Sequence, residues 1–259
     1  MIEVIKAGKT MQGRAVLESL SFALQPERFY GIIGPNGAGK STLLQLLSGI
    51  SKPSSGQVLL DGKEVSALPP KRLAKRLAVL QQGGLPAVGF TVRQTVAMGR
   101  FPFQNWFGDE SGDAEPLIDE AIRVMGLGKL ENRSLAALSG GERQRVALAK
   151  VMAQEPEIVL LDEPTTYLDI GYQIQLLDTV RQWRREKGIT VIAVLHDLNL
   201  AALYCDELLV LHEGRLISQG APEEVLDEEL IRHVYGAGAE IVAHPANGMP
   251  QILLRPGVR

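Results

Sequence analysis

The stretch GPNGAGKST at residues 34–42 decides the fold of this chain. It follows an apolar run at 29–33 and precedes a segment from Lys40 to Leu47 whose leucines share one face, so the sequence predicts a strand, a glycine loop and a helix in succession. In such a loop the backbone N–H groups point at phosphate oxygens, Lys40 adds a positive charge and the Ser41 hydroxyl binds Mg²⁺. We call residues 34–42 the phosphate loop, and we expect the phosphates of a nucleotide to be bound by Gly34, Pro35, Asn36, Gly37, Ala38, Gly39, Lys40, Ser41 and Thr42.

Composition limits the classes of function that the chain can have. The 259 residues include 27 basic and 30 acidic side chains, which give a net charge of −3 and no basic field for nucleic acid. The single cysteine, Cys205, excludes an internal disulfide and a cysteine metal cluster. His196, Asp197 and Asp206 interrupt the most apolar long stretch, 190–211, and we find no secretion signal. We therefore expect a chain that is soluble on its own.

The middle of the chain changes to a helical pattern. Between Gln82 and Ala153, Thr91 is a plausible N-cap of one helix, and a second helix is predicted from Pro116 to Met125. A surface loop is expected at 100–116, between these two helices. This part of the sequence therefore predicts a helical region that follows the phosphate loop.

Strands are predicted on both sides of the helical region. Segments at 2–6 and 20–24 resemble strands near the start of the chain. Short apolar runs at 157–161 and 190–195 are typical of buried parallel strands, and the span 170–187 between them is typical of a helix. After about residue 237 the composition is that of a tail rich in glycine and proline.

Polar residues follow the two apolar runs directly. Asp162 and Glu163 come after the first run and His196 after the second, where parallel strands of an α/β sheet place a ligand crevice. Asp162 can hold Mg²⁺, Glu163 can orient and deprotonate an attacking water, and His196 can donate to a γ-phosphate. The alternatives are a solvated turn for the acidic pair and a structural hydrogen-bonded role for the histidine.

A second phosphate site is indicated by LSGGERQRVALAK at 138–150. Ser139, Gly140 and Gly141 stand at the predicted start of a helix, where exposed backbone N–H groups attract anions. Neither this site nor the glycine loop would enclose a triphosphate alone.

Six motifs occur in the order and approximate spacing found in the ATP-binding subunits of ABC transporters, which residues 2–235 resemble. They are GPNGAGKST at 34–42, the glutamine of AVLQQ at 78–82, LSGGERQR at 138–145, IVLLDEPT at 158–165, YLD at 167–169 and His196. Further stretches are similar to importers of iron–siderophore complexes, haem and cobalamin, and the ferrichrome-type hydroxamate siderophore importers look nearest. These stretches are FTVRQTVAMGRFPF at 90–103, VLHDLNLAALYCD at 194–206 and HPA at 244–246.

The resemblance implies an α/β fold with a P-loop NTPase core, an inserted α-helical subdomain and an N-terminal antiparallel β part. It implies one ABC ATP-binding domain over 1–259. The nucleotide-binding core would comprise 1–82 and 154–237, the helical subdomain 83–153 with LSGGERQR, and the tail 238–259.

The resemblance also implies a mechanism. Two copies would meet head to tail and enclose ATP between the phosphate loop of one and Ser139, Gly140 and Gly141 of the other. Glu163 would be the general base, and His196 would act with it. Gln82, rather than Gln81, would contact Mg²⁺ and the water, and Asp169 would reach across the dimer. Mg²⁺ would be held by Ser41, Gln82 and Asp162.

The implied partners are a second copy of the chain, transmembrane permease subunits and, indirectly, an extracytoplasmic solute-binding protein. The chain would lie at the cytoplasmic face of the membrane, bound through the permease, and would be an ATPase coupled to solute import, with no nucleic-acid partner. Ferric siderophores are the expected solutes, and haem and cobalamin are alternatives. A soluble ABC ATPase acting on ribosomes or DNA is the alternative of another class, but no tandem cassette or long coiled-coil insertion occurs here. A regulatory GTPase or small-molecule kinase lacks the LSGGERQR helix.

Three stretches leave questions open. The family often stacks adenine on an aromatic residue before the phosphate loop, but here Met11 and Arg14 are the nearest candidates to contact the base. The basic segment at 69–76 is either a solvated helix face or a nucleic-acid patch, and the first is favoured. FPFQNWF at 101–107 is either local packing or a surface that faces a partner.

Overall fold

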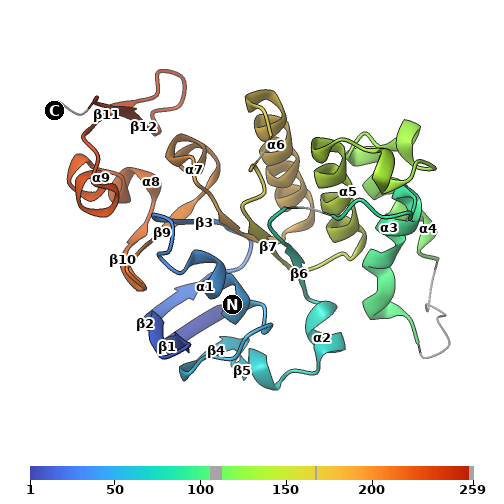
Figure 1. Ribbon diagram of the computed structural model, residues 1–259, viewed down its shortest axis with the longest axis horizontal. Helices are drawn as coiled ribbons and strands as arrows, with labels where there is room; N and C mark the ends of the chain where they lie inside the picture. The colour runs from blue at the N-terminus through green and yellow to red at the C-terminus, as the bar shows by residue number, and fades with distance from the viewer. Residues whose placement is uncertain (84, 106–112, 167, 257–259) are drawn as a thin grey trace. The chain divides into compact units, whose positions relative to one another are not determined.

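The computed structural model describes residues 1–83, 85–105, 113–166 and 168–256. The chain divides into two compact units. We call Met1–Ala67 with Thr190–Arg259 the sheet unit, and Leu68–Ile189 the helical unit. The sheet unit contains the blue and orange-to-red segments of Figure 1, and the helical unit contains the green and yellow ones. The segment 83–153, expected to be helical, lies inside the helical unit.

The sheet unit contains two larger sets of strands and a two-stranded hairpin, together with short helices. Its elements are β1 (Ile2–Met11), β2 (Arg14–Leu24), β3 (Phe29–Ile33), α1 (Lys40–Leu47), β4 (Ser55–Leu60), β5 (Lys63–Glu64), η1 (Val65–Ala67), β8 (Thr190–Val194), α7 (Leu198–Tyr204), β9 (Glu207–His212), β10 (Arg215–Gly220), α8 (Pro222–Val225), α9 (Glu228–Tyr235), β11 (Ala239–Ala243) and β12 (Pro250–Leu254). One set is antiparallel in the order β2-β1-β4-β5, and the other runs β10-β9-β3-β8. The antiparallel set confirms the predicted β part near the start of the chain.

The strand β3 leads into the phosphate loop and is buried along its whole length, as β8 is. It pairs in parallel with β8 on one side and with β9 on the other. Strands covered on both faces read as continuous apolar runs, which explains the sequence at 29–33 and 190–195. The loop after β3 is therefore supported by the core of the sheet unit.

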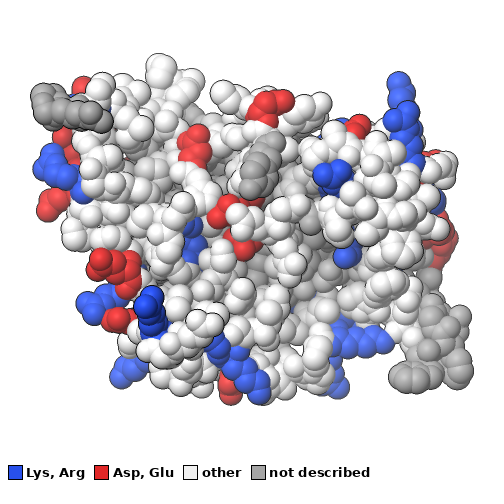
Figure 2. Space-filling view, in the orientation of Figure 1, with Lys and Arg blue, Asp and Glu red and all other residues white. Residues whose placement is uncertain are grey.

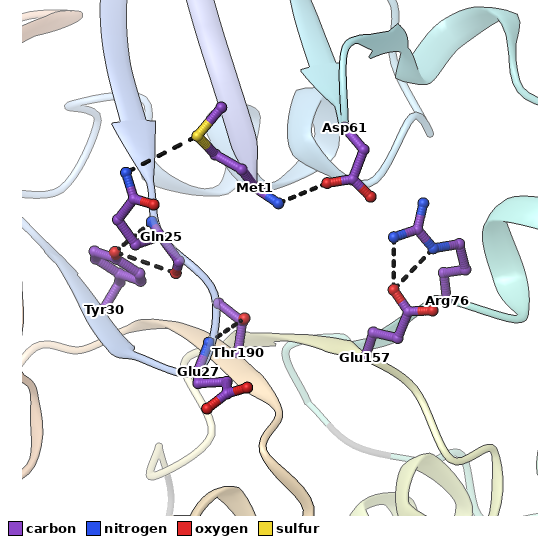
Figure 3. A network of polar contacts seen from close by, with 8 residues as sticks. All are labelled: Met1, Gln25, Glu27, Tyr30, Asp61, Arg76, Glu157 and Thr190. Atoms are coloured by element: carbon purple, nitrogen blue, oxygen red, sulfur yellow. Dashed lines mark hydrogen bonds and ion pairs between the residues drawn. The ribbon is translucent and has the colours of Figure 1, made fainter.

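Polar contacts fix the turn that precedes β3 (Figure 3). The Tyr30 hydroxyl accepts a hydrogen bond from the Gln25 N–H at 2.7 Å and donates to the Gln25 carbonyl at 3.3 Å. The Glu27 N–H donates to Thr190 Oγ1 at 2.9 Å, which joins the turn to the first residue of β8. Burial raises the pKa of Tyr30, so its hydroxyl stays protonated and keeps donating at neutral pH.

The helical unit contains one pair of parallel strands and most of the long helices. Its elements are α2 (Pro70–Ala74), β6 (Leu77–Leu80), α3 (Val92–Ala97), the 3₁₀ helix η2 (Met98–Phe103), α4 (Glu115–Val124), η3 (Gly128–Leu130), η4 (Leu135–Ala137), α5 (Gly140–Ala153), β7 (Ile158–Asp162) and α6 (Ile170–Lys187). Strands β6 and β7 pair so that Leu80 lies beside Leu161. Just before these strands, Arg76 forms an ion pair with Glu157 at 2.6 Å (Figure 3). Both strands therefore end at the same edge.

The predicted helix starts in the helical unit are confirmed. Thr91 caps α3 by accepting from the Gln94 N–H at 3.2 Å, and the Gln94 side chain bonds back to the Thr91 N–H. This reciprocal pair satisfies two N–H groups at the start of the helix. The predicted helix from Pro116 to Met125 is α4, which begins and ends one residue earlier.

The predicted surface loop at 100–116 is wrong in its first residues. These belong to η2, where Arg100 is buried, because its guanidinium donates to the Ala153 carbonyl at 2.8 Å and stacks on the Phe103 ring at 4.0 Å. A buried arginine with these partners fixes η2 against the end of α5. Residues 106–112, with Trp106 and Phe107 of FPFQNWF, lie outside the described residues.

The segment expected to be a tail contains a β-hairpin. Strands β11 and β12 pair antiparallel, with Ile241 opposite Ile252. The hairpin packs on the sheet unit through β12 against α7 and through β11 against α9 (Figure 1). Among the described residues, no helix is both long and apolar enough to span a membrane.

Candidate functional site

The phosphate loop has a backbone path that only glycine accommodates at two positions. Gly34 has φ +147°, and a Cβ there would lie 2.0 Å from the Leu211 carbonyl oxygen. Gly39 has φ +99°, and a Cβ there would lie 2.5 Å from the Leu17 side chain. Any other residue would clash with β9 or β2 at these points. The loop can therefore bring its backbone close to a ligand.

Lys40 stands at the start of α1, with its ammonium group turned back over the loop. Its Nζ donates to the carbonyl oxygens of Gly34 at 2.8 Å and Pro35 at 3.0 Å, and the side chain is buried. Ser41 follows it in the first turn of α1 and is half-buried. A positive charge at the N-terminal end of a helix, where the helix dipole is also positive, is suited to binding phosphate.

His196 lies at the same edge of the sheet unit as the phosphate loop. It follows β8, which pairs with β3, and the Leu195 N–H donates to the Ile32 carbonyl at 3.2 Å. The side chain is exposed. Asp197, the next residue, caps α7 by accepting from the Asn199 and Leu200 N–H groups at 2.8 and 3.0 Å. His196 thus stands between two backbone positions that are fixed.

In the helical unit, Gln82 and Glu163 follow the ends of β6 and β7. The Gln82 Nε2 donates to Glu163 Oε2 at 2.6 Å, and the Thr166 hydroxyl donates to the same oxygen at 3.2 Å. Gln82, not the neighbouring Gln81, forms this bond. Glu163 has φ +50°, a conformation that is strained for a residue with a side chain and recurs at functional sites. The carboxylate is therefore oriented by two donors.

The residues expected to bind Mg²⁺ have the appropriate ligand chemistry. Asp162 ends β7 and is half-buried, beside Glu163. Carboxylate, hydroxyl and amide oxygens, as in Asp162, Ser41 and Gln82, are the ligands that Mg²⁺ prefers, with water and substrate phosphates completing its shell. Within the described ranges, no group of three or more His, Cys, Asp or Glu side chains could hold a metal by itself.

The LSGGERQR segment starts the helix α5, as expected. Ser139 is the N-cap: its hydroxyl accepts from the Glu142 N–H at 3.3 Å and donates to Glu142 Oε2 at 2.8 Å. The Ser139 N–H also donates to this oxygen, at 2.7 Å, which lowers the pKa of Glu142. Ser139 and Gly140 are exposed, and a Cβ on Gly140 would meet no atom within 4 Å. The start of α5 is therefore accessible to an anion from outside the unit.

Two glutamines for which the sequence indicated no role, Gln144 inside LSGGERQR and Gln173, connect α5 and α6 to the turn after Glu163. The Gln144 side chain, on α5, is buried and donates to the Pro164 carbonyl at 3.1 Å. The Gln173 side chain, on α6, donates to the Thr165 and Leu168 carbonyls at 3.3 and 2.9 Å. A glutamine on a helix otherwise rich in buried aliphatic residues was the available signal for Gln144.

Asp169 occupies the N-cap of α6, where its Oδ1 accepts from the Tyr172 N–H at 3.0 Å. The residue is exposed. Tyr167, part of the YLD motif, lies outside the described residues. The helical unit therefore brings together Gln82, Asp162 and Glu163 at one strand edge, and presents Ser139 and Asp169 at two helix starts.

The β1–β2 turn carries the two residues considered for contact with a base. Met11 lies opposite Arg14 across this turn, and its side chain is 49% exposed. A thioether and a guanidinium side by side can both pack on the face of a purine.

Of the other two stretches left open, the basic one at 69–76 contains the short helix α2, and two of its charges have local contacts. Arg76 is paired with Glu157, and Lys75 lies 5.1 Å from the Phe103 ring. On the face shown in Figure 2, basic and acidic side chains are scattered among uncharged ones. Phe101, by contrast, is 57% exposed, and Phe90 is 51% exposed. These apolar rings remain available to a partner.

Comparison with known proteins gives the family. A family described as ABC transporter matches residues 17–166. The chain is 43% identical over 238 residues to the ferric enterobactin transport ATP-binding protein of Escherichia coli, covering 92% of this chain and 88% of that protein. It is also 43% identical over 246 residues to the hemin import ATP-binding protein of Rhodococcus jostii, covering 95% of this chain and 83% of that one.

Among solved structures, one similar chain is an ATP-binding cassette in a dimeric, post-hydrolysis state bound to ADP and phosphate. The match has a TM-score of 0.75 and 25% identity, and covers 85% of this chain and 98% of that one. The fold, the ordered motifs and the relatives agree, and the chain belongs to the ABC transporter family as an ATP-binding subunit.

Proposed function

We propose that this chain hydrolyses ATP to drive an importer, and that two copies bind each ATP between the phosphate loop of one and the α5 start of the other. The observation that carries this proposal is that the chain has two features suited to binding phosphate, the loop at 34–42 and the exposed helix start at Ser139. A dimeric relative bound to ADP and phosphate supports the arrangement. Asp169, exposed at the start of α6, would reach the other copy.

The chemistry is divided among groups with different roles. Lys40 and the loop N–H groups bind the β- and γ-phosphates, while Ser41, Asp162 and Gln82 hold Mg²⁺, which neutralises phosphate charge when bound. Glu163 takes the proton of the attacking water, and the bonds from Gln82 and Thr166 orient its carboxylate for this step. His196 donates to the γ-phosphate and stabilises the charge that develops there.

The partner of the helical unit is a membrane permease. The described residues 85–105 follow Gln82 along the chain and carry the exposed rings of Phe90 and Phe101, which suit an apolar contact with a permease helix. Binding of a permease here would be coupled to the hydrogen bond between Gln82 and Glu163, because Gln82 is joined along the chain to the segment that the permease contacts. The subunit would then lie at the cytoplasmic face of the membrane, bound through the permease.

The solute is a ferric siderophore delivered to the permease by an extracytoplasmic binding protein. The relative in Escherichia coli is named for ferric enterobactin transport, which supports this class. The hemin import relative has the same identity, so haem is the second candidate. Within the siderophores, a hydroxamate stays a prediction from the sequence resemblance alone.

Radiolabelled uptake in a strain that lacks this protein tests the proposal. Uptake of iron from a ferric siderophore is expected to be lost, to return with the wild-type chain, and not to return with Lys40→Ala. The same strain is assayed with a hydroxamate, a catecholate, haem and cobalamin. Loss of haem or cobalamin uptake alone would refute the siderophore assignment, and normal uptake of all four would refute the import role.

A further inference from the structure

The C-terminal hairpin contacts the sheet unit next to His196. The contact is made by Asn199, in the first turn of α7, whose Oδ1 accepts from the Ile252 N–H at 2.7 Å and whose Nδ2 donates to the Ile252 carbonyl at 3.4 Å. Both backbone groups of one β12 residue are thus bonded to a single side-chain amide. The amide takes the place that a neighbouring strand would occupy at this point.

Asn199 is held from the other side by the turn that follows His196. Its own N–H donates to Asp197 Oδ1 at 2.8 Å. A continuous chain of contacts therefore runs from Ile252 through Asn199 to Asp197, the residue after His196. Leu195, the residue before His196, is hydrogen-bonded to β3, and Asp197, the residue after it, is hydrogen-bonded to Asn199. The backbone of His196 is therefore held on both sides.

Contacts at both ends of the hairpin hold Ile252 in place. The Ile252 side chain is buried, and the hairpin turn is closed by a bond from the His244 N–H to the Met249 carbonyl at 2.8 Å. The Ala246 N–H donates to the His244 ring nitrogen at 3.2 Å within the same turn. The base of the hairpin is closed by the Arg255 N–H, which donates to the Gly238 carbonyl at 2.8 Å. The hairpin is thus tied at both ends.

The same C-terminal segment reaches the phosphate loop. Tyr235, the last residue of α9, is hydrogen-bonded to the backbone of Gly34. Since α9 also packs against β11, the segment from α9 to β12 contacts the phosphate loop through Tyr235 and the helix α7 through Ile252. HPA at 244–246 lies in the hairpin turn and DLN at 197–199 at the start of α7, and the proposed activity assigns no role to either stretch.

We infer that Asn199 is a positioning residue, which transfers the rigidity of the C-terminal hairpin to His196 and so sets the turnover rate of ATP hydrolysis. The inference rests on the proposed role of His196. A positioning residue of this kind does not touch the nucleotide. Its loss displaces His196 and leaves the phosphate loop intact, so it is expected to lower kcat and to leave ATP affinity nearly unchanged.

The test compares purified full-length variants for kcat and for ATP affinity. Asn199→Ala removes both bonds to Ile252 and is expected to lower kcat by about tenfold, while the Kd for ATP changes less than about twofold. Asn199→Asp keeps the oxygen that accepts from the Ile252 N–H but places a second carboxylate oxygen against the Ile252 carbonyl, so its kcat is expected to fall as well. Leu254→Ser is the matched control, because Leu254 lies on the same strand with a side chain that is 70% exposed.

A double-mutant cycle shows whether Asn199 acts through His196. If it does, Asn199→Ala lowers kcat in the wild-type chain and has no further effect in a His196→Ala chain. Equal losses in both backgrounds would overturn the inference, as would a parallel loss of ATP affinity or an unchanged kcat. A wild-type chain without ATPase activity would overturn the proposed function itself, and the positioning role with it.

Discussion

Replacing Glu163 by glutamine isolates its proposed role as the base. Oε2 of Glu163 accepts bonds from Gln82 at 2.6 Å and Thr166 at 3.2 Å, and the amide oxygen of a glutamine can accept both. The variant therefore keeps the shape and the bonds of the site and loses the ability to take a proton. General-base catalysis contributes at least about 100-fold, which corresponds to about 2.7 kcal/mol of transition-state stabilisation.

Turnover of ATP by purified Glu163→Gln is thus expected to fall by about 100-fold or more, while ATP still binds. The assay measures phosphate release at saturating ATP and Mg²⁺, with nucleotide affinity measured in parallel. Glu157→Gln is the matched control. It is the same substitution at a residue just before β7, whose side chain lies in an exposed ion pair with Arg76. Near-normal turnover in Glu163→Gln would exclude Glu163 as the base.

Two further predictions concern the base contact and the start of α5. Met11→Tyr supplies an aromatic face at the exposed β1–β2 turn and is expected to tighten ATP binding by about tenfold, measured by titration with ATP and GTP. Unchanged affinity would show that the adenine ring does not stack on this turn. Glu142→Ala breaks the capping box and is expected to lower the free energy of unfolding by about 1 kcal/mol at pH 7. Hydrogen bonds from Ser139 lower the pKa of Glu142. The stability difference between the wild type and Glu142→Ala is therefore present above pH 4.5, the ordinary pKa of glutamate, and is lost as the pH falls through the lowered pKa. Denaturant titrations at several pH values measure this loss. A difference that grows on acidification would contradict the assigned cause.

Local signals in the sequence were sufficient for the elements around the phosphate loop. The helix predicted from Lys40 to Leu47 is α1, and the span predicted at 170–187 is α6, with the same bounds. Both follow residues with strong start signals, a glycine loop and the N-cap Asp169. Strands buried on both faces were equally clear, because nearly every position in them is apolar, with Thr190 at the start of β8 as the polar exception.

The parts that the sequence did not predict depend on contacts between distant residues. The strands of the C-terminal hairpin are short, and Pro250 begins one of them, so composition alone indicated a tail. The bonds from Gln144 to Pro164 and from Asn199 to Ile252 join residues 20 and 53 positions apart. Arg100 is buried where composition indicated a loop, because its partners lie at the end of α5. The periodicity of apolar residues along the sequence does not indicate such contacts between distant residues.

The ATP-dependent association of two inactive variants tests most directly whether each ATP is shared between two copies. Lys40→Ala removes the cation that we propose binds phosphate, and Ser139→Arg blocks the start of α5. Neither chain alone can form a complete site, but a mixed dimer restores one site with an intact loop and an intact helix start. Sedimentation of the mixture with ATP and Mg²⁺ is expected to show a dimer that neither variant forms alone. A mixture that stays monomeric, while the wild-type chain hydrolyses ATP as a monomer, would contradict the account.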